Sequence, residues 1–174
     1  ILYGMGVNAL KENLGTDRKE AQEFYDAYFA QFHQLATYLQ AVIASAKQTG
    51  FAQTLFGRRR YFPLMNSSMP QMRAMAERMA INAPIQGTQA DIIKISMVAI
   101  DKALTENNLT GHAKMLLQVH DELIFEVDEK FTDKIHNIVV SVMENCIPAE
   151  FTTGRKTVPI NVGTALAKDW GSMK

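Results

Sequence analysis

Three polar residues with catalytic potential stand together in an otherwise apolar stretch. His120, Asp121 and Glu122 separate two apolar runs within residues 115–127. Apolar, strand-favouring residues on both sides of a short polar break predict a buried β-hairpin with its turn at this triplet. Two adjacent carboxylates at such a tip repel each other and are costly to desolvate, so a cation is expected to offset them.

A divalent metal ion is the cation that best suits these ligands. Mg²⁺ binds oxygen ligands, usually one or two protein carboxylates together with phosphate oxygens, and this is the equipment of a phosphoryl-transfer site. The residue types leave a second interpretation open, because Asp is common in turns and two acids also keep an exposed hairpin tip hydrated. The rest of the sequence has to decide between a metal-binding turn and a solvated one.

Cationic residues gather in the first half of the chain. Arg58, Arg59 and Arg60 are consecutive, and Arg73 and Arg78 follow them. The run is either a solvated surface or a phosphate-binding segment, and the residue types leave both interpretations open. The whole chain has 18 Lys and Arg against 18 Asp and Glu, so its net charge gives no sign of nucleic-acid binding. Unevenly placed charges can still form a basic face.

A second polar pattern lies in a helix expected to begin near Pro70. Arg78, Asn82 and Gln86 follow at four-residue spacing, which lines up three hydrogen-bonding side chains on one helix face, although Pro84 is expected to kink the helix. Minor-groove acceptors are nearly the same for every base pair, so such side chains can test pair geometry without reading sequence. The alternative is an ordinary polar outer face of an amphipathic helix.

The remaining elements follow from apolar periodicity. Helical patterns cover residues 17–46 with a break near His33, 88–104 and 131–146, and extended segments cover 51–63 and 158–162. The aromatic stripe of the first helix and the methionine stripe of residues 65–79 are expected to lie in the core. Helices first, and later antiparallel strands flanked by helices, predict the α+β class.

Length and composition are those of a globular protein. The 174 residues are 47% apolar, which suffices for one domain or two closely packed subdomains. Cys146 is the single cysteine, so an internal disulfide is excluded; its expected role is core packing, and the usage fits a reducing compartment. No apolar run reaches the length of a membrane span and no secretory start is present, so we expect a soluble, cytoplasmic protein without a membrane partner.

Several motifs together resemble family A (bacterial DNA polymerase I-like) DNA polymerases. The run Gln118-Val-His-Asp-Glu122 is similar to the last catalytic motif of that family. Three further segments resemble, in order, the end of its nucleotide-binding fingers helix, its arginine-rich segment and its helix beside the primer–template minor groove: residues 1–4, 54–61 and 77–88. Residues 168–170 are similar to its C-terminus. Agreement in this order over nearly the whole chain is more specific than any single motif.

The resemblance implies a division of the chain and an activity. Residues 1–84 would be part of the fingers subdomain, and residues 85–174 part of the palm with the catalytic hairpin 115–127. The activity would be template-directed DNA synthesis, in replication or repair, by nucleotidyl transfer with two Mg²⁺ ions. Asp121 would hold the metal ions, with Glu122 as a weaker ligand or an outer partner. A bacterial host would place the protein at the nucleoid.

The same match implies contacts to primer–template DNA. Gln118 and His120 would contact the primer end, and Tyr3 would lie at the template-base position. The contacts to the minor groove would be made by Arg78, Asn82 and Gln86. The contacts to the phosphates would be made by Arg58, Arg59 and Arg60. Deoxynucleoside triphosphates and the upstream remainder of the polymerase complete the expected partners.

The chain begins with Ile1 inside what resembles the fingers helix, so the Lys and Arg that grip the triphosphate and the second catalytic Asp are expected upstream. The isolated chain is therefore predicted to be inactive. Two alternatives remain open. One is a non-catalytic DNA-binding fragment, and the other is a metal-dependent phosphohydrolase, which would need further ligands that His33, His112 and His136 do not supply at suitable spacing.

Overall fold

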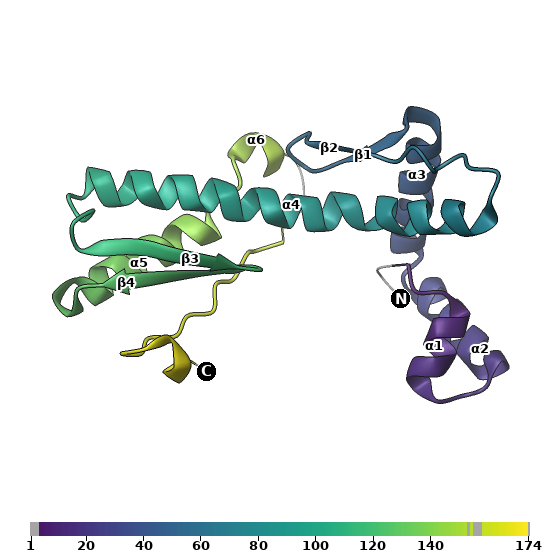
Figure 1. Ribbon diagram of the computed structural model, residues 1–174, viewed down its shortest axis with the longest axis horizontal. Helices are drawn as coiled ribbons and strands as arrows, with labels where there is room; N and C mark the ends of the chain where they lie inside the picture. Colours follow the sequence, from purple (N-terminus) through teal and green to yellow (C-terminus); the bar gives the residue numbers. More distant parts are fainter. Residues whose placement is uncertain (1–3, 153, 155–157, 174) are drawn as a thin grey trace. The chain divides into compact units, whose positions relative to one another are not determined.

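The computed structural model describes residues 4–152, 154 and 158–173, and the chain divides into two compact units, Ile1–Gln89 and Ala90–Lys174. The first unit contains three helices and a small hairpin: α1 (Val7–Leu14), α2 (Arg18–Gln31), α3 (His33–Thr49), β1 (Phe51–Gln53) and β2 (Arg59–Tyr61). The long helix α4 (Pro70–Glu106) belongs to both units. The second unit adds a longer hairpin and further helices: β3 (Ala113–Val119), β4 (Glu122–Val127), α5 (Thr132–Glu144) and α6 (Ala149–Thr152) (Figure 1).

Each unit combines helices with a two-stranded antiparallel sheet, which confirms the α+β prediction. Single-turn 3₁₀ helices occur at Glu129–Phe131 and Trp170–Ser172. The expected break near His33 is present, because α2 ends at Gln31 and α3 begins at His33. Asp17 is the N-cap of α2, and its carboxylate accepts a hydrogen bond from the Glu20 amide at 2.9 Å.

The aromatic stripe of α2 is not a core face, so that prediction is wrong. Ala21 is the buried residue of this helix, whereas Phe24 is 51% exposed and Phe32 is 50% exposed. The rings pack mainly against one another, as in the edge-to-face pair of Tyr25 and Phe29. Among the described elements, α2 contacts chiefly α1 and α3, and these two helices leave much of the stripe uncovered.

The core of the first unit is built from small residues. Helix α3 ends at Gly50, whose φ of +80° reverses the chain into β1. The β1–β2 hairpin then lies against α4, and the buried cluster comprises Ala46, Ala52, Phe62, Met65, Ala76, Ala80 and Ala83. The methionine stripe is only partly buried: Met65 is 1% exposed, but Met69 and Met75 are 55% and 40% exposed. Alanines on α4 occupy the face that approaches the hairpin, because only small side chains allow so close an approach.

Helix α4 begins at Pro70, as expected, and continues through Pro84 as one helix (Figure 1). The backbone amide of Met69, just before the helix, donates to the Ser67 hydroxyl at 3.2 Å. Pro84 has no N–H, so one i to i−4 hydrogen bond is missing at this turn. The carbonyl that loses its partner is that of Ala80, and one turn later the Thr88 hydroxyl donates to the Pro84 carbonyl.

The core of the second unit lies between one face of the β3–β4 hairpin and the two helices α4 and α5. The buried members are Ile100, Leu104, Leu109, Ala113 and Ile135. Half-buried residues of the hairpin and of α5 surround them, among them Met115, Phe125 and Val139. The amphipathic helix expected over residues 131–146 is therefore confirmed, and Cys146 is buried at 8% exposure.

The other face of this hairpin is open in the described chain, so the expectation of a fully buried hairpin is wrong. A β-bulge interrupts the ladder between Met115, which pairs with Phe125, and Leu117, which pairs with Ile124. The bulge leaves Leu116 without a partner residue. Leu116 and Leu117 are 57% and 42% exposed, because the helices of this unit cover only the opposite face of the sheet.

The final strand expected over residues 158–162 does not form. Among the described residues this segment has no ladder partner, and Pro159 could not donate to one. Side chains of α5 contact the end of the segment and a residue beyond it: the Val162 amide donates to Glu144 Oε1 at 3.2 Å, and His136 Nε2 lies 3.0 Å from the Thr164 hydroxyl.

Candidate metal-binding turn and nucleic-acid interface

The β3–β4 turn brings together four residues singled out from the sequence. Val119 pairs with Glu122, so the turn itself consists of His120 and Asp121. His120 has a φ of +52°, in the left-handed region that disfavours a side chain. The Gln118 amide group donates to the His120 carbonyl and closes the turn from the strand side. The expected hairpin and its polar tip are thus confirmed, with Glu122 in the strand instead of the turn.

The tip offers two adjacent carboxylates that suit a hard cation. Asp121 and Glu122 are both exposed, and carboxylate oxygens are the ligands that Mg²⁺ takes. No group of three His, Cys, Asp or Glu residues placed to hold a metal ion is found within residues 4–152, 154 and 158–173. The donor set of the turn therefore fits a magnesium ion that draws its other ligands from phosphate, water or another polypeptide segment.

The three polar residues on α4 lie on one stretch of continuous helix. Arg78 and Gln86 are exposed and Asn82 is half-buried. Gly4 approaches the stem of Arg78 so closely that a Cβ on Gly4 would lie 2.9 Å from Arg78 Cγ. Gly4 also has a φ of +81°, so any other residue there would be strained as well as crowded. The N-terminal segment thus limits where the Arg78 side chain can lie.

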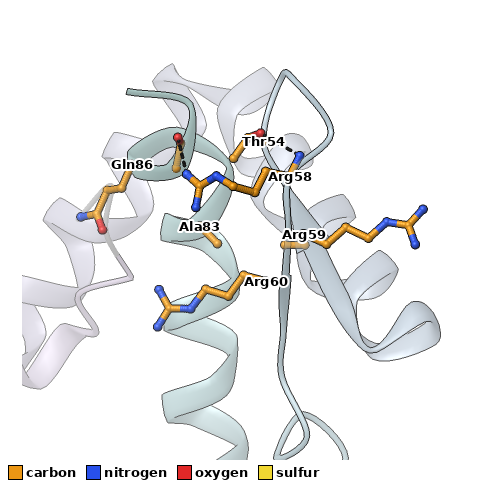
Figure 2. A pocket seen from close by; sticks show the side chains of 8 residues that line it. Thr54, Arg58, Arg59, Arg60, Ala83 and Gln86 are labelled. Carbon is orange, nitrogen blue, oxygen red and sulfur yellow. Dashed lines mark hydrogen bonds between the residues drawn. The ribbon is translucent and has the colours of Figure 1, made fainter. Parts of the chain in front are cut away.

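The three consecutive arginines differ in their surroundings. The Arg58 guanidinium donates to the Gly87 carbonyl on α4 at 2.9 Å. Arg59 points away from α4 in Figure 2, with its guanidinium 4.4 Å from the centre of the Phe51 ring, and Arg60 lies 5.7 Å from the Phe62 ring. Together with Thr54 and Gln86 the arginines line a cavity of about 80 Å³ between the β1–β2 turn and α4 (Figure 2).

Sequence reasoning missed how firmly the β1–β2 turn is attached to α4. Besides Arg58, the backbone amide of Leu55 donates to the Thr88 hydroxyl at 2.9 Å. Gly87 makes this approach possible, since a Cβ there would lie 2.6 Å from Thr54 Cγ2. A glycine within a helical pattern is the sequence signal of such a close approach, and it was the one available sign.

Tyr3, expected at the template-base position, lies outside the described residues.

None of the described helices combines the length and the apolar character required to cross a lipid bilayer.

Comparison with known proteins decides the family. The family model described as DNA polymerase family A matches residues 1–172. The chain belongs to DNA polymerase family A. Among its family A relatives, DNA polymerase I of Rhizobium leguminosarum is 42% identical over 170 residues, and the thermostable DNA polymerase I of Thermus aquaticus is 36% identical over 174 residues. The resemblance noted from the motifs is therefore confirmed.

The match covers nearly all of this chain but a small part of its family A relatives. The alignments span 98% and 100% of the chain, and only 16% of the Rhizobium and 20% of the Thermus protein. A solved family A structure, the POL domain of Pol1 from M. smegmatis in complex with DNA primer-template and dNTP, is similar with a TM-score of 0.80 and 41% identity. That similarity covers 84% of this chain and 26% of the solved chain.

Proposed function

We propose that this chain is the C-terminal part of a polymerase domain that carries out template-directed DNA synthesis in replication or repair. The observation that carries the proposal is the exposed Asp121–Glu122 pair at a tight hairpin turn, in a chain that matches the family over residues 1–172. In this assignment residues 1–84 are part of the fingers and residues 85–174 part of the palm. The partners are primer–template DNA, deoxynucleoside triphosphates and the upstream remainder of the polymerase.

Asp121 and Glu122 are proposed to hold magnesium. When bound, two such ions activate the primer 3′ hydroxyl and stabilise the leaving pyrophosphate. The chain itself supplies the position of the carboxylates: the two-residue turn fixes Asp121, and ladder pairing with Val119 fixes Glu122. Because a turn residue projects from the end of the sheet and a strand residue from its face, Asp121 is the main ligand in this proposal and Glu122 the weaker one.

The remaining polar residues are proposed to bind DNA. Gln118 and His120 border the carboxylates and would contact the primer end. Arg59 and Arg60 carry exposed guanidinium groups suited to phosphates. The Arg78, Asn82 and Gln86 face of α4 would test the minor groove, where donors and acceptors vary little with sequence. The Arg58 guanidinium instead donates to the Gly87 carbonyl, and the template-base role of Tyr3 is proposed from the motif alone.

One assay separates this proposal from the two alternatives. The chain is fused behind the upstream part of the Rhizobium leguminosarum relative, to give what we call the fused polymerase. With primed template, Mg²⁺ and four deoxynucleotides, the fused polymerase should extend the primer, and chelation of the metal should stop extension. DNA binding without extension would instead favour a non-catalytic fragment. Template-independent release of phosphate would favour a hydrolase, which needs ligands beyond the Asp121–Glu122 pair.

A further inference from the structure

Two residues weaken α4 next to Gln86. Pro84 lacks the N–H that would bond to the Ala80 carbonyl, so the turn just before Gln86 has lost a helix hydrogen bond. Gln86 stands two residues after the proline and Gly87 three residues after it, and glycine further lowers helix stability. A side chain that must test base-pair geometry needs a firm support, which the local helix alone does not provide.

The β1–β2 turn supplies that support from outside the helix. Arg58 Nη2 donates to the Gly87 carbonyl at 2.9 Å (Figure 2). The Leu55 amide donates to the Thr88 hydroxyl, which itself donates to the Pro84 carbonyl. The guanidinium bond is charge-assisted and therefore among the stronger ones of its kind. Both contacts from the β1–β2 turn reach the helix directly after Gln86, at Gly87 and Thr88.

The turn that bears Arg58 is itself rigid. The Thr54 amide donates to the Arg58 carbonyl at 2.9 Å, the Gly57 amide donates to the Thr54 carbonyl at 3.0 Å, and the Arg58 amide donates to the Thr54 hydroxyl at 3.1 Å. Thr54 is buried, with 6% of its surface exposed. Its Cγ2 would lie 2.6 Å from a Cβ on Gly87, so the two elements touch where the helix has no side chain.

We infer that Arg58 is a positioning residue that fixes the α4 turn carrying Gln86, and is not one of the phosphate contacts. This inference rests on the proposed function, in which Gln86 contacts the minor groove. Arg59 and Arg60 remain the phosphate ligands. Of the three consecutive arginines, Arg58 thus supports a turn of α4, and Arg59 and Arg60 bind DNA phosphates.

The first test compares matched losses of one charge in the fused polymerase. Arg58→Ala should slow extension of paired primers by about tenfold to a hundredfold, the scale of a misplaced contact. It should leave the salt dependence of DNA binding unchanged, whereas Arg59→Ala should lower the slope of log affinity against log salt by about one. In a double variant with Gln86→Ala, Arg58→Ala should cause no further loss of extension rate. Arg59→Ala should reduce the rate of the Gln86→Ala variant by the same factor as it reduces the parent rate. A reduced slope and a multiplicative effect for Arg58→Ala would overturn the inference.

A second pair of variants moves the same turn without changing any charge. Gly87→Ala should reproduce the slow extension of Arg58→Ala, because the added Cβ collides with Thr54 Cγ2. Thr54→Ser removes that methyl group and keeps the hydroxyl, so the double variant Gly87→Ala with Thr54→Ser should recover the rate. Normal extension by Gly87→Ala alone would contradict the positioning role.

Hydrogen exchange separates failure of this inference from failure of the proposed function. In the 174-residue chain, Arg58→Ala and Gly87→Ala should each speed exchange of the amides in residues 85–91, whether or not any polymerase activity exists. Unchanged exchange would overturn the support role by itself. If exchange is faster but the Gln86→Ala variant extends primers at the normal rate, support of the helix turn does not matter for extension. That result would also overturn the minor-groove role proposed for Gln86.

Discussion

At the scale of single residues, the two acids at the tip of the β3–β4 hairpin occupy different backbone positions. Asp121 sits in the turn and Glu122 in the ladder opposite Val119. The following strand residues provide a comparison, because Glu126 is an exposed acid on the same strand and pairs with Lys114 away from the tip. The hairpin therefore contains its own control for the loss of a carboxylate.

Asp121→Asn in the fused polymerase should reduce nucleotide addition by at least about a thousandfold, because several kcal/mol of metal-dependent stabilisation are lost. DNA affinity should change little, since the phosphate contacts remain. Glu122→Gln should be less harmful and Glu126→Gln nearly neutral. Single-turnover extension and DNA-binding titrations measure the two quantities. Equal loss of rate and of affinity for Asp121→Asn would mean that the turn is structural.

His120 gives a second prediction at this scale. Its φ of +52° costs a non-glycine residue on the order of 1 kcal/mol, which glycine would not incur. His120→Gly should therefore melt no lower than the parent chain, yet extension by the fused polymerase should slow because the imidazole is lost. Thermal melting and primer extension test the two parts. A His120→Gly variant that extends normally would show that the residue serves only the turn.

At the scale of elements, the sequence predicted the features that depend on neighbouring residues, namely helix starts and turns. The hairpin around His120 followed from two apolar runs, and the start of α4 followed from the Ser67-to-Pro70 segment, because caps and turns depend on neighbouring residues. The burial of Phe24 and of Leu116 was wrongly predicted, since it depends on what covers an apolar face. The attachment of Arg58 to Gly87 joins residues far apart in sequence, so no periodicity could reveal it.

The core that supports the hairpin can be tested on α4. Ile100 is fully buried between α4, the hairpin and α5, whereas Val98 on the same helix is 73% exposed. Ile100→Ala should lower the free energy of unfolding by about 2–5 kcal/mol through lost burial and a cavity. Val98→Ala should change it by less than about 0.5 kcal/mol. Urea unfolding followed by circular dichroism compares them, and similar midpoints would show that this core does not limit stability.

At the scale of the whole molecule, the chain spans less than a quarter of the length of the Rhizobium and Thermus relatives. Family membership could be predicted because five motifs occur in order, although the net charge of zero pointed the other way. The exposed aromatic residues of α2 and the open face of the β3–β4 hairpin could not be predicted, because the pattern of a sequence identifies an apolar face but not the surface that meets it.

The isolated 174-residue chain should yield no extended product from primed template with Mg²⁺ and four deoxynucleotides. The Asp121–Glu122 pair supplies carboxylates on one side only, and the metal pair of nucleotidyl transfer needs them on both sides. A separately purified upstream fragment of the Rhizobium leguminosarum relative should restore some extension when mixed with the chain. Gel analysis of labelled primer measures both. Robust extension by the chain alone would refute the placement of its catalytic partners upstream.

The bulge at Leu116 determines which changes of length the hairpin can absorb. Without that residue the ladder would run regularly from Met115 to Val119, and each of the pairs that flank the bulge would be kept. Deletion of Leu116 should therefore leave the two-residue loop and the carboxylates at its end in place. Deletion of Ile124, a paired residue of the opposite strand, increases the mismatch in length between the two strands and should move the loop. If extension survives the first deletion and not the second, Leu116 is a residue that β3 can lose without a change in pairing register, whereas the paired residues are not.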